Sequence, residues 1–133
     1  MISISKLAAI IILIIFTSLA IFQVSLVFGA PFGHFAWGGQ NKVLPLQFRI
    51  GSIISVLLYV LFCLIALDKS HTRNIFKKQQ VSQIGSWVIV GYSFVGIFMN
   101  GLSKSNSERN LMTPLTAIIF LLFLLIAMSE KSR

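Results

Sequence analysis

Four apolar runs separated by polar connectors dominate the chain. They cover residues Leu7 to Phe28, Ile50 to Leu67, Ile84 to Leu102 and Leu111 to Met128. Each run has 18 to 22 residues, and an α-helix needs about 20 apolar residues to cross the hydrocarbon core of a bilayer. The pattern therefore predicts an all-α fold, a transmembrane four-helix bundle that occupies residues 1–133 as one membrane domain.

The first apolar run has to be distinguished from a signal peptide. Its 22 residues exceed the roughly 7 to 15 of a signal-peptide apolar region, and Pro31 follows where small residues would be needed for cleavage. We interpret the run as a retained span.

Small and polar residues recur on one face of the second and third predicted helices. The second helix carries Ser52, Ser55, Tyr59, Cys63 and Ala66, and the third carries Ser82, Ser86, Ser93, Gly96 and Asn100. Membrane helices use such faces to approach closely and to hydrogen-bond across an interface. We expect two packing faces, with the Tyr59 hydroxyl near Ser93. A polar pathway would use the same residues, but no ionisable side chain lies at mid-depth to support one.

The fourth helix is expected to begin at Thr113 and Pro114. Threonine is a suitable N-cap residue, and proline is tolerated at the first helical position, where its missing N–H group costs nothing. The preceding segment from Ser103 to Asn110 then becomes a short polar loop.

The connector Gly29 to Arg49 differs from the other two because it is long, rich in glycine and aromatic. It contains four of the nine glycines and two of the three prolines, so it cannot be a helix. Phe32, Phe35 and Trp37 make it too apolar to remain solvated. The sequence predicts a long structured outer loop between the first and second helices.

Charge and composition support a membrane protein. Hydrophobic residues make up 56% of the chain, and the net charge is +8. The basic residues stand at the ends of the apolar runs and form no stripe of the kind that binds nucleic acid, so no nucleic-acid partner is expected. Seven Lys and Arg residues belong to the two termini and the second connector, against four in the other connectors. The positive-inside rule then predicts a multi-pass protein of the plasma membrane with both termini cytoplasmic.

Few residues suggest chemistry. The motifs of metalloproteases, serine hydrolases and nucleotide-binding proteins are absent. His34 and His71 are predicted on opposite sides of the membrane, and Cys63 is the only cysteine, so neither a metal site nor a cofactor is expected. No residue can be assigned as catalytic.

The polar residues predicted at the outer surface form the candidate site. Arg49 extends the polar face of the second helix, and Glu108 is the only acidic residue predicted outside, so we expect Arg49 to join the first loop to the third through Glu108 or Asn100. An ion pair that ties loops together is a commoner role for Glu108 than catalysis. The candidate ligand-binding residues of this outer rim are His34, Trp37, Gln40, Asn41, Arg49, Ser52, Asn100, Glu108 and Arg109.

The two outer loops together resemble a set of small, uncharacterised four-span bacterial membrane proteins. In that set, the first outer loop contains Pro-(Trp/Phe)-Gly, Gly-Gly, Leu-Pro and Arg in this order. A later segment contains Asn, Ser, Glu-Arg and Thr-Pro in this order. The matching residues are Pro31, Gly33, Trp37, Gly38, Gly39, Leu44, Pro45, Arg49, Ser52, Asn100, Ser103, Ser105, Glu108, Arg109, Thr113 and Pro114. The resemblance implies the four-span architecture and no particular activity.

Three functions are compatible with these features. The first is a non-enzymatic membrane protein whose outer loops form a cap or pocket for a lipid headgroup, a small amphiphile or a partner protein, which can be another membrane protein or a second copy. The second is a membrane enzyme acting on a lipid-linked or extracytoplasmic substrate. The third is a small channel or carrier. The concentration of unusual residues at the outer face favours the first.

Overall fold

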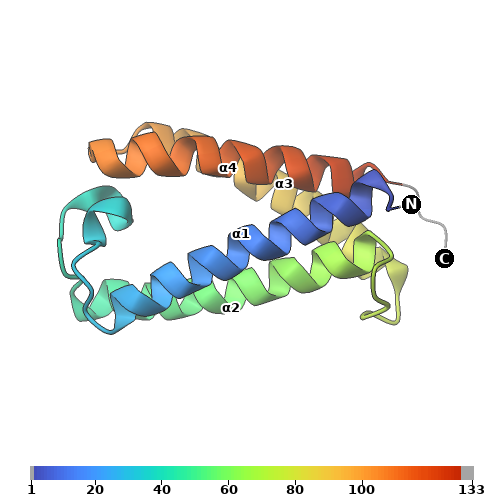
Figure 1. Cartoon of the computed structure of the whole chain (residues 1–133), viewed down its shortest axis with the longest axis horizontal. Coiled ribbons are helices and arrows are strands. Elements are labelled where there is room, and N and C mark those ends of the chain that lie inside the picture. The colour runs from blue at the N-terminus through green and yellow to red at the C-terminus, as the bar shows by residue number, and fades with distance from the viewer. Residues whose placement is uncertain (1, 130–133) are drawn as a thin grey trace.

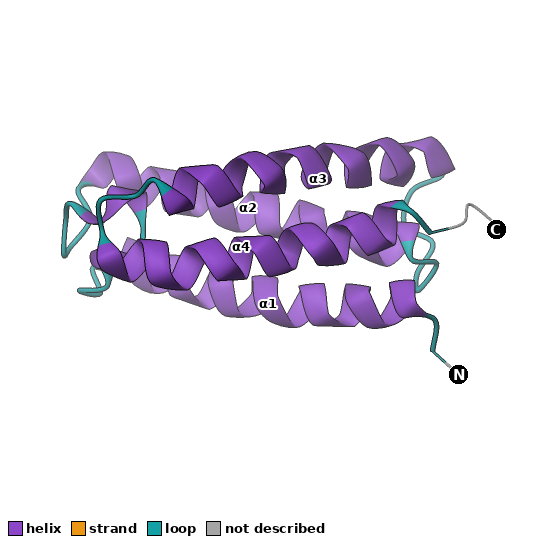
Figure 2. Ribbon diagram, turned by 90° about the horizontal axis from the view of Figure 1, so that it is seen from above, coloured by secondary structure: helices purple, strands orange, loops and turns teal. Residues whose placement is uncertain are grey.

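Four long helices build the protein. In the computed structural model, which describes residues 2–129, α1 spans Ile4–Val27, α2 Leu46–Lys69, α3 Gln79–Gly101 and α4 Asn106–Ala127. The helices run up and down beside one another, so that α1 begins and α4 ends at the same end of the bundle (Figures 1 and 2). At 1.5 Å per residue, helices of this length reach about 33 to 36 Å, which is enough to cross a hydrocarbon core of about 30 Å.

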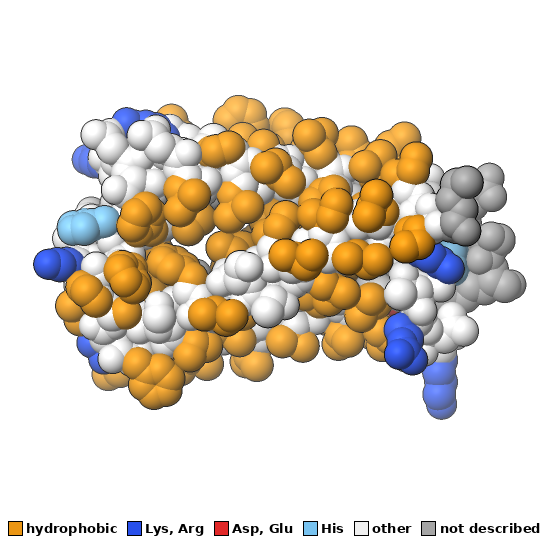
Figure 3. Space-filling model, viewed as in Figure 1, with side chains coloured by type: hydrophobic (Ala, Val, Ile, Leu, Met, Phe, Trp, Pro, Cys, Tyr) orange, Lys and Arg blue, Asp and Glu red, His pale blue; other side chains and the backbone are white. Residues whose placement is uncertain are grey.

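All four helices are candidate membrane spans by length and composition. The protein is therefore an all-α, multi-pass membrane protein, as the apolar runs predicted. On the face shown in Figure 3, hydrophobic side chains cover the middle of the bundle and the visible Lys and Arg side chains lie toward its two ends. We call the end with the α1–α2 and α3–α4 connectors the loop end, and the opposite end the terminal end.

Each helix begins three to five residues before the apolar run that predicted it. α2 begins four residues before Ile50, and α3 and α4 each begin five residues before their apolar runs. The α1–α2 connector shortens to residues 28–45, the α2–α3 connector to 70–78 and the α3–α4 connector to 102–105. The physical reason is that hydropathy marks the part of a helix inside hydrocarbon, whereas polar residues continue the same helix into the headgroup region.

The start predicted for α4 at Thr113 and Pro114 is wrong. The helix begins after Ser105, whose Oγ accepts a hydrogen bond from the Glu108 backbone N–H over 3.3 Å. This is the N-cap half of a Ser-x-x-Glu capping box. Pro114 lies inside α4, and the buried Thr113 hydroxyl has no hydrogen-bond partner among the described residues.

The end of α1 is set by a glycine. Gly29 has a φ of +93°, which only glycine adopts readily. Its N–H donates to the Leu26 carbonyl over 3.1 Å, and the Ala30 N–H donates to the Ser25 carbonyl over 3.0 Å. These two bonds form a Schellman motif, which satisfies carbonyls left free at the helix end and turns the chain into the connector.

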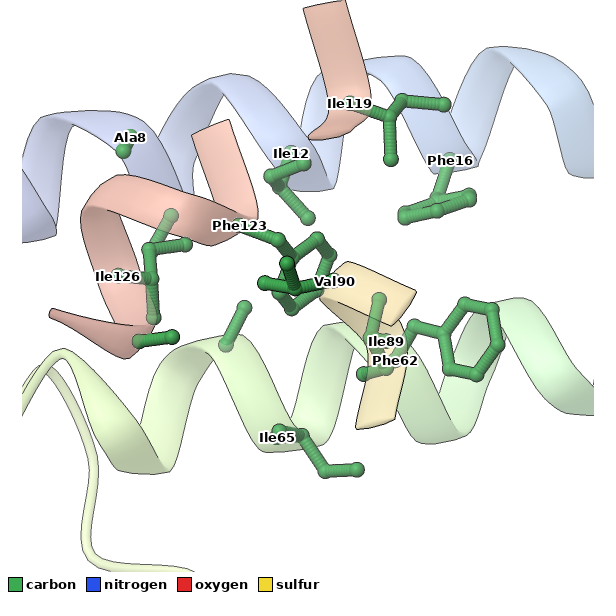
Figure 4. Close-up of a cluster of buried hydrophobic side chains, with 13 residues drawn as sticks. Ala8, Ile12, Phe16, Phe62, Ile65, Ile89, Val90, Ile119, Phe123 and Ile126 are labelled. Carbon is green, nitrogen blue, oxygen red and sulfur yellow. The ribbon is translucent and has the colours of Figure 1, made fainter. Parts of the chain in front are cut away.

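The main hydrophobic core lies toward the terminal end. All four helices contribute to it, and Ile12 of α1 and Phe123 of α4 have no exposed surface. Figure 4 shows the Phe123 ring between Ile12 and Val90. The terminal half of the bundle is therefore closed by packed side chains.

Two charged residues are buried where α2 ends. Asp68 Oδ1 accepts hydrogen bonds from the backbone N–H groups of Ile75 and Phe76, over 2.8 and 3.2 Å. Lys69 Nζ donates to the Ser129 carbonyl oxygen over 2.7 Å and to its Oγ over 3.0 Å. Asp68 thus orders the α2–α3 connector, and Lys69 ties α2 to the segment after α4.

The polar face of α3 is a packing face in this fold. Ser82 and Ser86 are completely buried, and their hydroxyls donate to carbonyls of their own helix, those of Gln79 and Gln83. A Cβ added at Gly85 would lie 2.9 Å from Ile65 of α2. These side chains allow α3 to approach its neighbours and do not form a polar pathway along this part of the helix.

Candidate functional site

The α1–α2 connector is fixed to α2 through Trp37. Its Nε1 donates to Ser52 Oγ over 3.1 Å, and its ring stacks on Phe48, with centroids 5.4 Å apart and planes 11° from parallel. A Cβ added at Gly51 would lie 2.6 Å from the Trp37 ring. The absence of a side chain at Gly51 therefore allows the tryptophan to lie against the first turns of α2.

Trp37 also stands in an unusual backbone conformation. The connector contains two 3-10 turns, η1 over Gly33–Phe35 and η2 over Trp37–Gly39. Within η2, Trp37, Gly38 and Gly39 have φ values of +54°, +79° and +72°. A bulky residue at positive φ is rare, and such strain persists only where the surrounding structure holds it in place.

The same segment also contacts the start of α4. The Gly38 N–H donates to Glu108 Oε2 over 3.3 Å, and Ser105 Oγ donates to the His34 carbonyl oxygen over 2.6 Å. We call residues 33–39 the cap. It bridges the first turns of α2 and α4, because Trp37 lies against one and Gly38 bonds to the other.

A cavity of about 530 Å³ lies beneath the cap, between the four helices. Phe16, Phe35, Trp37, Tyr59, Phe62 and Tyr92 supply aromatic walls. Figure 3 shows the surface hollowed near the loop end. Several α3 residues that line the cavity are also exposed on the bundle surface, among them Val95 and Met99. The cavity therefore reaches the side of the bundle.

One buried amide in the cavity wall is incompletely bonded. Gln23 of α1 is 8% exposed, and its Nε2 donates to the Tyr59 hydroxyl over 3.3 Å. Its Oε1 has no hydrogen-bond partner within residues 2–129. Tyr59 and Ser93, which we expected to lie near each other, both line the cavity, and the tyrosine hydroxyl accepts its hydrogen bond from α1.

Glu108 brings a carboxylate to the top of the cavity. It is 7% exposed, and no Lys, Arg or His in the described part of the chain forms an ion pair with it. It lies in the first turn of α4, where the helix dipole favours a negative charge. Among the described residues, the cavity lining contains no Lys, Arg or His, and Glu108 is its only carboxylate-bearing side chain.

The predicted link between Arg49 and Glu108 is wrong. Arg49 Nε donates to the Leu44 carbonyl oxygen over 2.8 Å, and its Nη1 donates to the Val27 carbonyl oxygen over 3.4 Å. Arg49 therefore joins the end of α1 to the connector just before α2. Asn100, the alternative partner, donates to Thr116 Oγ1 of α4 over 2.8 Å.

The predicted rim residues divide into three groups. Trp37, Asn100 and Glu108 line the cavity, and Ser52 holds Trp37 from behind. His34 and Gln40 line a separate shallow recess of about 300 Å³. Arg49, Arg109 and Asn41 line neither space; Arg109 donates to the Ser103 carbonyl oxygen over 3.0 Å and to Asn106 Oδ1.

The rim prediction missed the deeper polar residues of the cavity. Gln23, Tyr59 and Thr116 line it below the surface. The signal for Gln23 was present, because an amide in the middle of an apolar run needs a polar neighbour. Among the described residues, no three His, Cys, Asp or Glu side chains are grouped so that they could hold a metal ion.

Comparisons with protein-family models, curated proteins and solved structures give no match to this chain. The four-span architecture that the sequence resemblance implied is present, but no family or relative is identified. Membership of the bacterial set remains a prediction.

Proposed function

We propose that this protein binds a small amphiphile in the cavity beneath its cap. The cavity carries the proposal: its volume of about 530 Å³ falls within the range of roughly 300 to 1,000 Å³ of small-molecule sites. Its walls combine aromatic and aliphatic side chains with a few polar groups. An apolar chain would lie among the helices, and a polar head would reach Glu108 and the cap.

The side of the bundle provides the route of entry. Val95 and Met99 line the cavity and are 58% and 67% exposed, at a level where a bilayer would surround α3. An amphiphile partitioned into the bilayer could therefore enter between the helices, tail first. With the cap on the outer face, as the positive-inside rule predicts, the ligand would come from the outer leaflet.

The packed terminal half favours a binding protein over a channel. Below the cavity, Ile12 and Phe123 fill the space between the helices without exposed surface. A continuous water path would have to pass through this cluster. The enzyme alternative has less support, because His34 lies outside the cavity and its Nδ1 is 3.1 Å from the Gly39 carbonyl oxygen.

Photolabelling tests the proposal. The protein is placed in phosphatidylcholine nanodiscs with dodecanol that carries a photoreactive diazirine, and labelled peptides are identified by mass spectrometry. We expect saturable labelling of cavity residues such as Leu19 and Leu115. A binding cavity would be contradicted if labelling increased linearly with dodecanol and occurred only at outward residues such as Ile21 and Leu121.

Two variants on α3 give a matched control. Ser93 is 3% exposed and lines the cavity, so Ser93→Leu should fill part of it and remove most of the saturable labelling. Gly91 is exposed, and an added Cβ there meets nothing within 4 Å, so Gly91→Leu should leave labelling unchanged. Circular dichroism verifies that both variants keep their helices. Equal labelling in the two variants would overturn the assignment to this cavity.

A further inference from the structure

We infer that the amphiphile carries a cationic head, a protonated amine or a quaternary ammonium group. The inference rests on the proposed function and names the chemical class of its ligand. It follows from three features of the cavity as the described residues form it: a buried carboxylate without a cationic partner, a lining without Lys, Arg or His, and a buried amide oxygen that accepts no hydrogen bond.

The carboxylate is the first feature. Glu108 is 7% exposed, and burying a charge is costly unless it is paired. Its side chain accepts a hydrogen bond from a neutral donor, the Gly38 N–H, over 3.3 Å. The adjacent Arg109 is turned away, toward the Ser103 carbonyl and Asn106. A cation in the cavity would supply the missing counter-charge.

The remaining lining suits a cation better than an anion. Within residues 2–129, it contains no Lys, Arg or His, although the chain has a net charge of +8. It includes aromatic residues, among them Phe35 and Trp37 of the cap, and the electron-rich faces of aromatic rings attract ammonium groups. Gln23 Oε1 is buried without a hydrogen-bond partner in the described chain and offers an acceptor for an N–H group deeper in the cavity.

Competition against the dodecanol photoprobe tests the head group. The competitors are dodecylammonium, dodecyltrimethylammonium, unlabelled dodecanol and dodecyl sulfate, compared at equal bilayer-bound mole fractions measured on protein-free nanodiscs. A charge-assisted contact corresponds to a preference of about ten- to a hundredfold. We expect each cation to displace the probe at a bilayer concentration about ten to a hundred times lower than the dodecanol concentration that has the same effect. Dodecyl sulfate should be the weakest competitor.

The net charge of the protein works against this result. A surface of +8 would draw an anionic amphiphile more than a cationic one. A preference for cations therefore cannot come from general electrostatics and has to arise in the cavity. A preference for dodecyl sulfate, or equal competition by all four compounds, would overturn the inference.

Two variants assign the preference to Glu108. Glu108→Gln keeps an oxygen that can accept a hydrogen bond from the Gly38 N–H, and glutamine suits the third helical position. Labelling by dodecanol should therefore persist, while the preference for cations over dodecanol should disappear. Met112 lines the cavity one turn after Glu108, so the ammonium of Met112→Lys can pair with the carboxylate at the favourable i, i+4 spacing. This variant should also lose the preference.

The outcomes separate the two proposals. Absence of saturable dodecanol labelling in the native protein means that the cavity takes no amphiphile, and the proposed function fails. Saturable labelling with a cation preference that survives in both Glu108→Gln and Met112→Lys means that an amphiphile binds but that Glu108 does not select its head.

Discussion

Gly38 and Gly39 have nearly the same backbone conformation but very different surroundings. Their φ values are +79° and +72°, so a side chain at either position costs roughly 1 to 2 kcal/mol in backbone strain. A Cβ at Gly38 meets nothing within 4 Å, whereas a Cβ at Gly39 would overlap Ser105 and lie 2.9 Å from the His34 carbonyl oxygen. At Gly39 the cap therefore lies directly against Ser105, the N-cap residue of α4.

This difference predicts unequal effects of two alanine substitutions. Gly38→Ala should lower stability by the strain alone, about 1 to 2 kcal/mol. Gly39→Ala should lower it further, by roughly 1 to 3 kcal/mol for the forced contact. Thermal unfolding in nanodiscs gives the comparison. Equal midpoints for the two variants would show that the cap does not lie against Ser105.

At the scale of single residues, sequence reasoning paired two side chains wrongly. Arg49 and Glu108 were matched as opposite charges, but each bonds to backbone groups, Arg49 to carbonyls near the end of α1 and Glu108 to the Gly38 N–H. Free carbonyls and N–H groups at helix ends and turns need partners as much as charges do. Their positions depend on the fold, which the sequence alone does not place.

At the scale of an element, the start of α4 illustrates two competing signals. The apolar run and the Thr113–Pro114 pair favoured a late start, whereas Ser105 and Glu108 form a Ser-x-x-Glu signature that begins six residues before the run. The structure follows the second signal, with Ser105 as N-cap. A hydropathy boundary locates the membrane, and a capping signature locates the helix.

Two further substitutions test where α4 begins. Ser105→Ala removes the N-cap acceptor and should lower stability by about 1 kcal/mol. Thr113→Ala removes a buried hydroxyl that has no partner among residues 2–129, so its effect should stay within about 0.5 kcal/mol. Thermal unfolding of both variants gives the measurement. A larger loss for Thr113→Ala would mean that the helix begins at the apolar run.

The cavity is a property of the whole molecule and was beyond sequence patterns. It exists because the closed core lies toward the terminal end, while the cap lies across the loop end. Hydropathy indicates which residues avoid water, whether in lipid or in the protein interior, and it does not predict where a cavity lies. Four helices and a polar α3 packing face were predictable, whereas the space between the helices depends on how they separate.

The orientation of the bundle is the remaining prediction at this scale. The α2–α3 connector, residues 70–78, contains Arg73, Lys77 and Lys78, whereas the α3–α4 connector, residues 102–105, contains only Lys104. Basic residues in short connectors stay on the cytoplasmic side during insertion. Two more basic residues, Lys131 and Arg133, follow α4 in the sequence but lie outside the described residues. The terminal end should therefore face the cytoplasm.

Cysteine labelling of intact cells measures this orientation. In a Cys63→Ser background, Lys104→Cys and Lys78→Cys each place one thiol at an exposed position, at opposite ends of the bundle. A membrane-impermeant maleimide should label position 104 in intact cells and position 78 only after the cells are opened. The reverse pattern would place the cap in the cytoplasm. The cavity could then still bind an amphiphile, but the ligand would have to enter from the inner leaflet, because Val95 and Met99 of the cavity wall lie in the half of α3 nearer the cap.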